Sequence, residues 1–102
     1  MKLAQTYKAL GDPVRLKMVQ RLSENPTYTL GSLSKGLGVT RQGARKHLMM
    51  LEEAKLVRLV PEGRETKVLL NKASLTKAKS FIAELERQWE TRLEALRDFT
   101  EQ

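Results

Sequence analysis

Apolar residues recur at helical spacing in the first quarter of the chain, between residues that start and end helices. Residues 3–10 are predicted to form a first helix, closed by Gly11. Asp12 followed by Pro13 is typical of a helix start, because Asp accepts from free backbone amides and proline needs no amide partner there. A second helix is therefore expected from Pro13 to the breaking pair Asn25-Pro26.

Two further helical segments are joined by a glycine-containing stretch. Thr29 can cap a short helix over residues 30–36, and Gly38 offers a turn position that tolerates positive φ. Thr40 can then cap a longer helix that runs to about Ala54. Two short helices with a tight turn between them predict a helix-turn-helix over residues 30–54.

The period of the pattern changes after Leu56. Residues 57–60 and 66–70 are β-prone and partly alternating, and Pro61 to Glu65 between them reads as a turn. We expect a β-hairpin with a basic tip over residues 57–70, which would form the wing of a winged helix-turn-helix. The predicted fold is therefore mostly α, with about five helices and a two-stranded wing.

The last predicted helix begins at Ser74 and carries an apolar stripe. Its stripe falls at steps of three and four residues, with one step of seven across Arg92: Leu75, Ala78, Ile82, Leu85, Trp89, Leu96 and Phe99, widened by Leu93. About 26 helical residues span roughly 39 Å, which is more than so small a domain can cover. We therefore expect part of this stripe to pack against a second copy of the chain.

Length and composition limit the function classes. The 102 residues fit one domain, and no apolar run approaches the length of a membrane span. The first residues lack the apolar core of a signal peptide, so we expect a cytoplasmic protein. The chain has no cysteine and one histidine, so no cofactor or metal site is predicted. An enzyme is not expected, because there is no phosphate loop and no Ser-His-acid constellation.

Charge is divided unevenly along the chain. The net charge is +7, but residues 1–74 carry +8 and residues 75–102 carry −1. This asymmetry favours a body that binds a polyanion and a neutral appendage. A basic, well-solvated protein without a nucleic-acid partner is the alternative that charge alone leaves open.

The predicted helix after Thr40 has two different faces on a wheel of 100° per residue. Ala44, Leu48 and Leu51 fall on one side and are expected in the core. The opposite side carries hydrogen-bonding and cationic groups in the first two turns. A helix that enters the major groove of DNA needs this arrangement, although a solvated helix face would look similar.

Individual roles follow from side-chain chemistry. Gln42 and Arg45 are expected to read bases, because Gln can pair with adenine and Arg with guanine. Thr40, Arg41 and Lys46 are expected to contact phosphates. The complete predicted DNA-binding set is Thr40, Arg41, Gln42, Gly43, Arg45, Lys46, His47 and Arg64.

Four side chains of this set or near it have competing interpretations. His47 lies on the flank of the core side, so it is expected to be packed or bonded to backbone, near a phosphate at most. Arg64 at the hairpin tip suits a narrow minor groove, but it could equally be an exposed turn residue. Met49 and Met50 are expected to pack at the helix border.

Several segments together resemble one family. The run from Ala9 to Leu16 resembles the opening signature of ArsR-type repressors, and Val39 to Leu48 is similar to their recognition helix. Leu51 to Val57, the wing residues Glu62 to Glu65 and the tail from Trp89 to Leu96 extend the resemblance over nearly the whole chain.

The resemblance implies a homodimer built from the first and last helices, here residues 1–10 and 74–102. The dimer would bind an operator with twofold symmetry and repress by blocking a promoter. The interface residues expected on this basis are Leu3, Tyr7, Leu85, Trp89, Leu93 and Leu96. Dimerisation would set the recognition helices about 34 Å apart, one turn of B-DNA.

The chain departs from the family pattern at three points. Arg45 stands where many relatives have Ser or Thr, so base preference does not carry over. Lys55 stands at the helix end where glycine is common, so a changed C-cap is expected. The family's metal sensors use cysteines near the third helix, or His and acidic ligands on the last helix, and neither set is present.

Three function classes therefore remain. A sequence-specific, metal-independent repressor of transcription is favoured. An architectural or nonspecific DNA-binding protein, or a winged-helix module for protein interaction, would also fit a basic body. The effector ligand, if there is one, is unknown.

Overall fold

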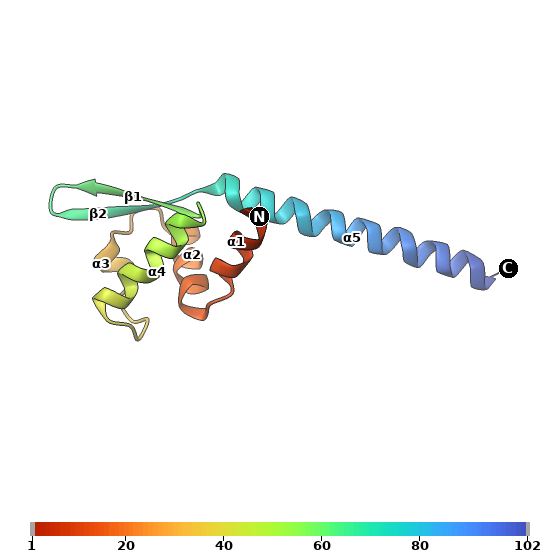
Figure 1. The fold of residues 1–102 in the computed structure, drawn as a ribbon, viewed down its shortest axis with the longest axis horizontal. Helices are drawn as coiled ribbons and strands as arrows, with labels where there is room; N and C mark the ends of the chain where they lie inside the picture. The colour runs from red at the N-terminus through yellow and green to blue at the C-terminus, as the bar shows by residue number, and fades with distance from the viewer. Residues whose placement is uncertain (1, 102) are drawn as a thin grey trace.

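The computed structural model of the protein describes residues 2–101. In chain order this range forms α1 (Lys2–Leu10), α2 (Pro13–Glu24), α3 (Leu30–Leu33), α4 (Arg41–Glu53), β1 (Val57–Glu62), β2 (Glu65–Leu70) and α5 (Lys72–Glu101) (Figure 1). The prediction of five helices with a two-stranded wing is confirmed. Met1 and Gln102, the outer ends of the predicted dimerisation segments, lie outside the described residues.

The hydrophobic core lies where α4 meets the other helices and the base of the wing. Helix α4 packs against α1, α2, α3 and β1. The residues predicted to face inward are fully buried, and they are joined by side chains from the neighbouring elements: Met18, Leu33, Ala44, Leu48, Leu51, Leu56 and Val68. This packing buries one side of α4, so the opposite side of the helix faces solvent.

Three of the predicted helix starts, at Asp12, Thr29 and Thr40, are confirmed by capping contacts. The Asp12 carboxylate accepts from the amides of Val14 and Arg15 at 2.8 and 3.1 Å. Thr29 accepts from the Ser32 amide at 3.2 Å, while the Ser32 hydroxyl accepts in return from the Thr29 amide. Each cap satisfies amides that have no partner inside their helix.

The third helix is shorter than predicted. It ends at Leu33 instead of Gly36, and residues 34–40 form the turn that leads to α4. Gly36 and Gly38 have φ values of 75° and 72°, in the left-handed region that glycine enters without a steric penalty. The left-handed backbone at Gly36 cannot continue a right-handed helix, so the predicted end was too late.

The wing strands are longer than predicted. Strand β1 pairs with β2 from Val57–Leu70 to Glu62–Glu65, so only Gly63 and Arg64 form the turn. Gly63 has a φ of 62°, which lets two residues reverse the chain and the ladder continue to the tip. At the other edge, Lys67 bridges Thr29 beside α3, which ties the wing to the helix-turn-helix.

The last helix begins at Lys72, two residues before the predicted start. Asn71 lies just before it, and its side-chain oxygen accepts from the Ala73 amide at 3.2 Å. The hydroxyl of Ser74, the predicted first residue, donates to the Lys55 carbonyl at 2.6 Å. The helix therefore starts earlier than predicted, and the side chain at the predicted start makes a tertiary contact.

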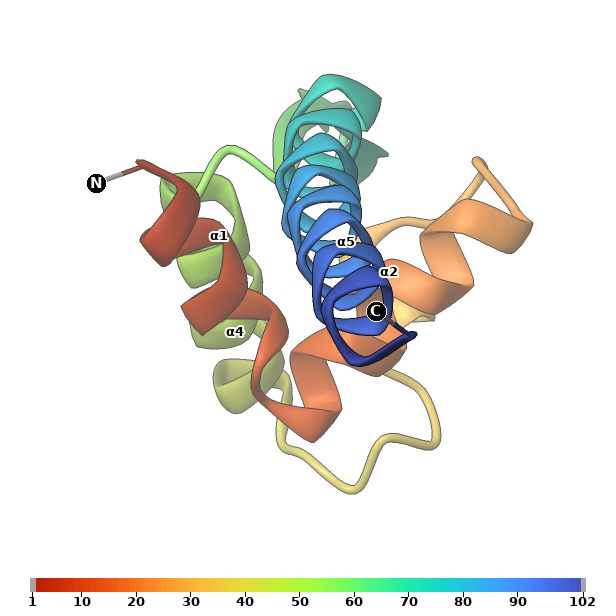
Figure 2. The same cartoon turned by 90° about the vertical axis from the view of Figure 1, so that its right-hand side faces the viewer.

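Helix α5 projects far beyond the body of the domain (Figure 1). It contains 30 residues, or roughly 45 Å of helix, and the molecule measures 69 × 25 × 25 Å. Viewed along α5 from its C-terminal end, the other helices lie behind its projecting part, and α1 packs against it (Figure 2). No helix within residues 2–101 is long and apolar enough to cross a membrane.

The end of α4 keeps the geometry expected of glycine although a lysine is present. The Leu56 amide donates to the Leu51 carbonyl and the Lys55 amide to the Glu52 carbonyl, both at 2.9 Å, which is the Schellman pattern. Lys55 has a φ of 62° and is the one non-glycine residue with positive φ among those described. The expected change of the C-cap is therefore wrong, and the lysine adopts a left-handed conformation that L-residues disfavour.

Replacing Lys55 with Gly should therefore stabilise the fold. The gain should be about 0.5–1 kcal/mol in the free energy of unfolding, because the steric cost of a Cβ at positive φ exceeds the entropy that glycine loses. Urea denaturation checks this value. The matched control is Lys79→Gly in exposed helix, where the same change should cost about 1 kcal/mol. Equal destabilisation by both variants would contradict the account of the cap.

Candidate nucleic-acid interface

The first two turns of α4 expose a cationic face. Arg41, Gln42, Arg45 and Lys46 are exposed, while Ala44 between them is buried. Within residues 2–101, none of these cations lies within 4.0 Å of a carboxylate. These cations are therefore not held in contact ion pairs, although the carboxylate of Glu65 lines the same cleft. The predicted division of the helix into a core side and a polar side is confirmed.

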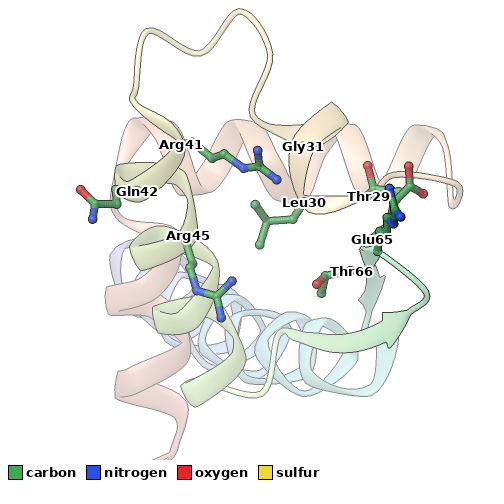
Figure 3. Close-up of a pocket in the computed structure, with 9 residues that line it drawn as sticks. Thr29, Leu30, Gly31, Arg41, Gln42, Arg45, Glu65 and Thr66 are labelled. Atoms are coloured by element: carbon green, nitrogen blue, oxygen red, sulfur yellow. The ribbon is translucent and has the colours of Figure 1, made fainter.

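A cleft of about 440 Å³ separates this face from the wing. Figure 3 shows the side chains of Arg41 and Arg45 extending from α4 toward the cleft, whereas the side-chain amide of Gln42 is directed outward. Gln42 and Arg64 of the wing turn also line the cleft. The fold thus brings three predicted arginines and Gln42 to one concavity, with the amide of Gln42 at its outer edge.

The cleft also contains residues that the sequence patterns did not identify. Thr29 and Leu30 come from the start of α3, and Glu65 and Thr66 come from β2. They meet there because the bridge between Thr29 and Lys67 brings β2 beside the start of α3. No periodicity within either segment signals this contact, because the two segments are more than thirty residues apart.

Thr40 and Gly43 form the N-terminal cap of α4. The Thr40 hydroxyl oxygen accepts from the Gly43 amide at 3.0 Å, so this amide is already paired. A Cβ at position 43 would lie 3.2 Å from the same oxygen, closer than an ordinary contact. Gly43 therefore serves the cap directly, whereas any contact of Gly43 with DNA remains a prediction.

The two methionines of α4 were expected to pack at the helix border. Met49 is 54% exposed and Met50 is 43% exposed, so both lie outside the core. Met49 lies on the same side of α4 as Gln42 and Arg45 by helical spacing. Met50 lies one third of a turn away, where its sulfur accepts from the Arg15 guanidinium at 3.4 Å.

His47 faces α2, away from the cleft. Its Nδ1 lies 3.1 Å from a guanidinium nitrogen of Arg15 and 4.0 Å from the Asp12 carboxylate. His47 was expected to be packed or bonded to backbone: it is packed and partly buried, and its partner is a side chain instead of the backbone. The pKa of Asp12 is lowered below its ordinary range, chiefly because the Arg15 amide donates to the carboxylate.

The predicted dimer residues fall into two groups. Tyr7 of α1 is half-buried: its hydroxyl donates to the Ala78 carbonyl at 2.6 Å and its ring lies 6.1 Å from that of Phe81. Leu3 is also half-buried. The residues on the projecting part of α5 are exposed, namely Leu85, Trp89, Leu93 and Leu96. Phe81, Ile82 and Phe99 are exposed beside them.

The acidic residues of α5 within the described range are not grouped as metal ligands would be. Glu84 pairs with Arg87, which donates two hydrogen bonds to its carboxylate and lowers its pKa. Within the described part of the chain, no three His, Asp or Glu side chains are grouped so that they could hold a metal ion.

A comparison with known proteins gives the class of the domain. The model of a family described as a helix-turn-helix domain matches residues 10–60. The HTH-type transcriptional regulator YuzN of Bacillus subtilis (strain 168) is 36% identical over 75 residues, which cover 68% of this chain and 82% of YuzN. The fold and the matches define a DNA-binding winged helix-turn-helix protein.

Two solved structures narrow the class to a family. The ArsR-like transcriptional regulator from Rhodococcus sp. RHA1 has 31% identity and a TM-score of 0.82, and the match covers 96% of this chain and 92% of that one. The transcriptional repressor BigR from Xylella fastidiosa has 27% identity and a TM-score of 0.62, with 80% of each chain covered. The chain belongs to the ArsR family of helix-turn-helix transcriptional regulators.

Proposed function

We propose that this regulator is a homodimeric, sequence-specific repressor that binds a twofold-symmetric operator and does not sense metal. The observation that carries the proposal is the exposed cationic face of α4, whose cations make no contact ion pair, beside the cleft that Arg41, Arg45 and Arg64 line. A major groove accepts one α-helix, and the wing then lies over the adjacent backbone and minor groove.

The side chains divide into two kinds of contact under this proposal. Arg45 and Gln42 read base edges, and Arg41, Lys46 and Thr40 hold phosphates near the N-terminus of α4. Arg64 reaches the minor groove from the tip of the wing. A strand of the DNA backbone passing over the cleft would meet Arg41 and Arg64 from opposite sides, which accounts for the cleft between them.

The proposed dimer is supported by the exposed apolar stripe on α5. Seven large apolar side chains from Phe81 to Phe99 are 40–78% exposed, and they lie along one side of a helix that projects from the domain. An apolar surface of this extent on a free helix favours association. A second copy supplies the same stripe, so antiparallel pairing about a twofold axis covers both.

Such a dimer would repress transcription by occupying promoter DNA and blocking the promoter. The similarity to BigR, which is described as a transcriptional repressor, supports this assignment. The chain contains no cysteine, so release by a metal bound to thiolates is not available to it.

A gel shift with the protein's own promoter and an excess of random duplex tests the proposed function. Binding that resists the competitor supports a sequence-specific regulator. Complete loss of the shift with competitor supports a nonspecific or architectural protein. No shift even at low salt supports the protein-interaction module and overturns the proposal.

Replacing Gln42 and Arg45 together with Ala should abolish sequence discrimination. The operator affinity should fall by about 2–5 kcal/mol, because two bidentate base contacts are lost, whereas affinity for random duplex should fall much less. Fluorescence anisotropy on both duplexes at one salt concentration measures this. Arg58→Ala removes an exposed cation of β1 outside the cleft and is the control. Equal losses on the two duplexes would refute the base-reading roles.

Replacing Trp89 and Leu96 together with Glu should convert the dimer to a monomer. Both side chains are more than half exposed, so the domain itself should keep its helical circular dichroism. Light scattering measures the mass. The control, Ala83→Glu with Thr91→Glu, adds the same two charges to the opposite side of α5 and should remain dimeric. A dimer that persists in the Trp89 and Leu96 variant would exclude α5 as the main interface.

A further inference from the structure

Arg15 is a buried cation that the proposed DNA-binding surface does not use. The residue is 8% exposed, and it belongs to the Ala9–Leu16 segment. A charge is seldom buried without several partners, because losing its hydration is costly. The partners of Arg15 therefore indicate what the buried guanidinium does.

One set of partners lies at the C-terminal end of α1. The Nε atom of Arg15 donates to the Ala9 carbonyl at 2.8 Å, and one terminal nitrogen lies 3.5 Å from the Lys8 carbonyl. The last carbonyls of a helix have no partner inside it and carry the negative end of its dipole. Arg15 thus caps α1 from the neighbouring helix α2.

A second set of partners lies on α4. The other terminal nitrogen of Arg15 donates to Nδ1 of His47 at 3.1 Å and to the sulfur of Met50 at 3.4 Å. Because a guanidinium has no acceptor, Nδ1 of His47 must accept, and the ring proton lies on Nε2. His47 and Met50 are three residues apart, so Arg15 holds α4 along one turn.

These contacts connect α4 to the elements of the proposed dimer. Helix α1 is bonded to α5 through the Tyr7 hydroxyl and the Ala78 carbonyl, which are 2.6 Å apart. Arg15 then bonds the end of α1 to His47. A continuous path of hydrogen bonds and one helix thus runs from α5 to the side of α4 that faces away from the cleft.

We propose that Arg15 is a positioning residue that sets the orientation of α4 relative to the dimer helices, acting through the acceptor on His47. The inference rests on the proposed function, since orientation matters only when two recognition helices must reach two half-sites at a fixed separation. Arg15 does not contact DNA in this role. It determines whether both α4 helices enter their grooves at once.

The role requires a planar fork of donors. Arg presents five N–H groups in fixed directions, so one side chain reaches the α1 carbonyls and His47 together. A lysine at position 15 would keep the charge but offers one compact ammonium group, which cannot span both sets of partners. Arg15→Lys should therefore retain the fold and lose the connection to α4.

Two variants of His47, to Asn and to Leu, provide the test, because the two new side chains have nearly the same shape as each other. Asn places its side-chain oxygen two bonds from Cβ, where Nδ1 of His47 lies, and Leu places a methyl group at the same point. Both variants lack Nε2, the one ring nitrogen that does not face Arg15. His47→Asn should keep operator affinity within about threefold, and His47→Leu should lose about tenfold, the effect of one lost hydrogen bond to a charged group.

Three measurements on full-length protein accompany each variant. They are anisotropy on an operator selected by the wild-type protein, anisotropy on random duplex, and operator affinity after the half-site spacing is changed by one base pair. His47→Leu and Arg15→Lys should bind random duplex as the wild type does, and they should lose the preference for the native spacing. A purely structural role would lower the thermal midpoint without changing that preference.

The control for Arg15→Lys is Arg87→Lys, which breaks an exposed bidentate pair on α5 and should change none of the three measurements. Equal losses in His47→Asn and His47→Leu, with a smaller salt dependence, would mean that His47 contacts phosphate directly and would overturn the proposal. Unchanged spacing preference in both His47→Leu and Arg15→Lys would also overturn it. A wild-type protein without operator preference would instead refute the proposed function, which separates the two failures.

Discussion

The burial of one side of α4 is the constraint on which the rest of the structure depends. Ala44, Leu48 and Leu51 have no exposed surface, and they are held by helices on several sides and by the first strand of the wing. A helix packed in this way cannot turn about its axis without exposing these side chains to water. The cations of its first two turns must therefore face outward, and they do so at the edge nearest the wing.

A single junction at the end of α4 holds α4, the wing and α5 together. The Lys55 carbonyl accepts from the Asn71 amide group at 2.8 Å and from the Ser74 hydroxyl at 2.6 Å. The Leu56 carbonyl accepts from the Asn71 backbone amide, also at 2.8 Å. The wing is the β-hairpin between Leu56 and Asn71, the two residues that these bonds join. Its base is therefore fixed, and its tip, with Arg64, lies at the far end of a paired ladder.

Helix α5 is packed against the domain in its first turns and exposed to solvent in its later turns. Its first turns belong to the domain, where Ala78 is buried and bonded to Tyr7, and its later turns leave the domain altogether. The same apolar stripe continues through both parts, so the surface that α1 covers near Ala78 is continuous with the surface that faces solvent at Trp89. A small domain buries little apolar surface on its own, so covering this stripe would add to its stability. Arg15 adds a second connection, because it bonds α1 to α4.

The sequence by itself determined the elements and their faces, because helix caps, turn glycines and apolar periodicity act over a few residues. Asp12, Thr29 and Thr40 start their helices as predicted, and the stripe of α5 is readable from spacing alone. The hairpin and the two faces of the helix after Thr40 were also readable from local patterns, and the family resemblance agreed with both. Only tertiary structure decided which partner each polar side chain takes. The Ser74 hydroxyl bonds to the Lys55 carbonyl, His47 bonds to Arg15, and Thr66 lies with Arg41 at one cleft. These pairs are distant in the chain, and their energies depend on packing that no local pattern contains.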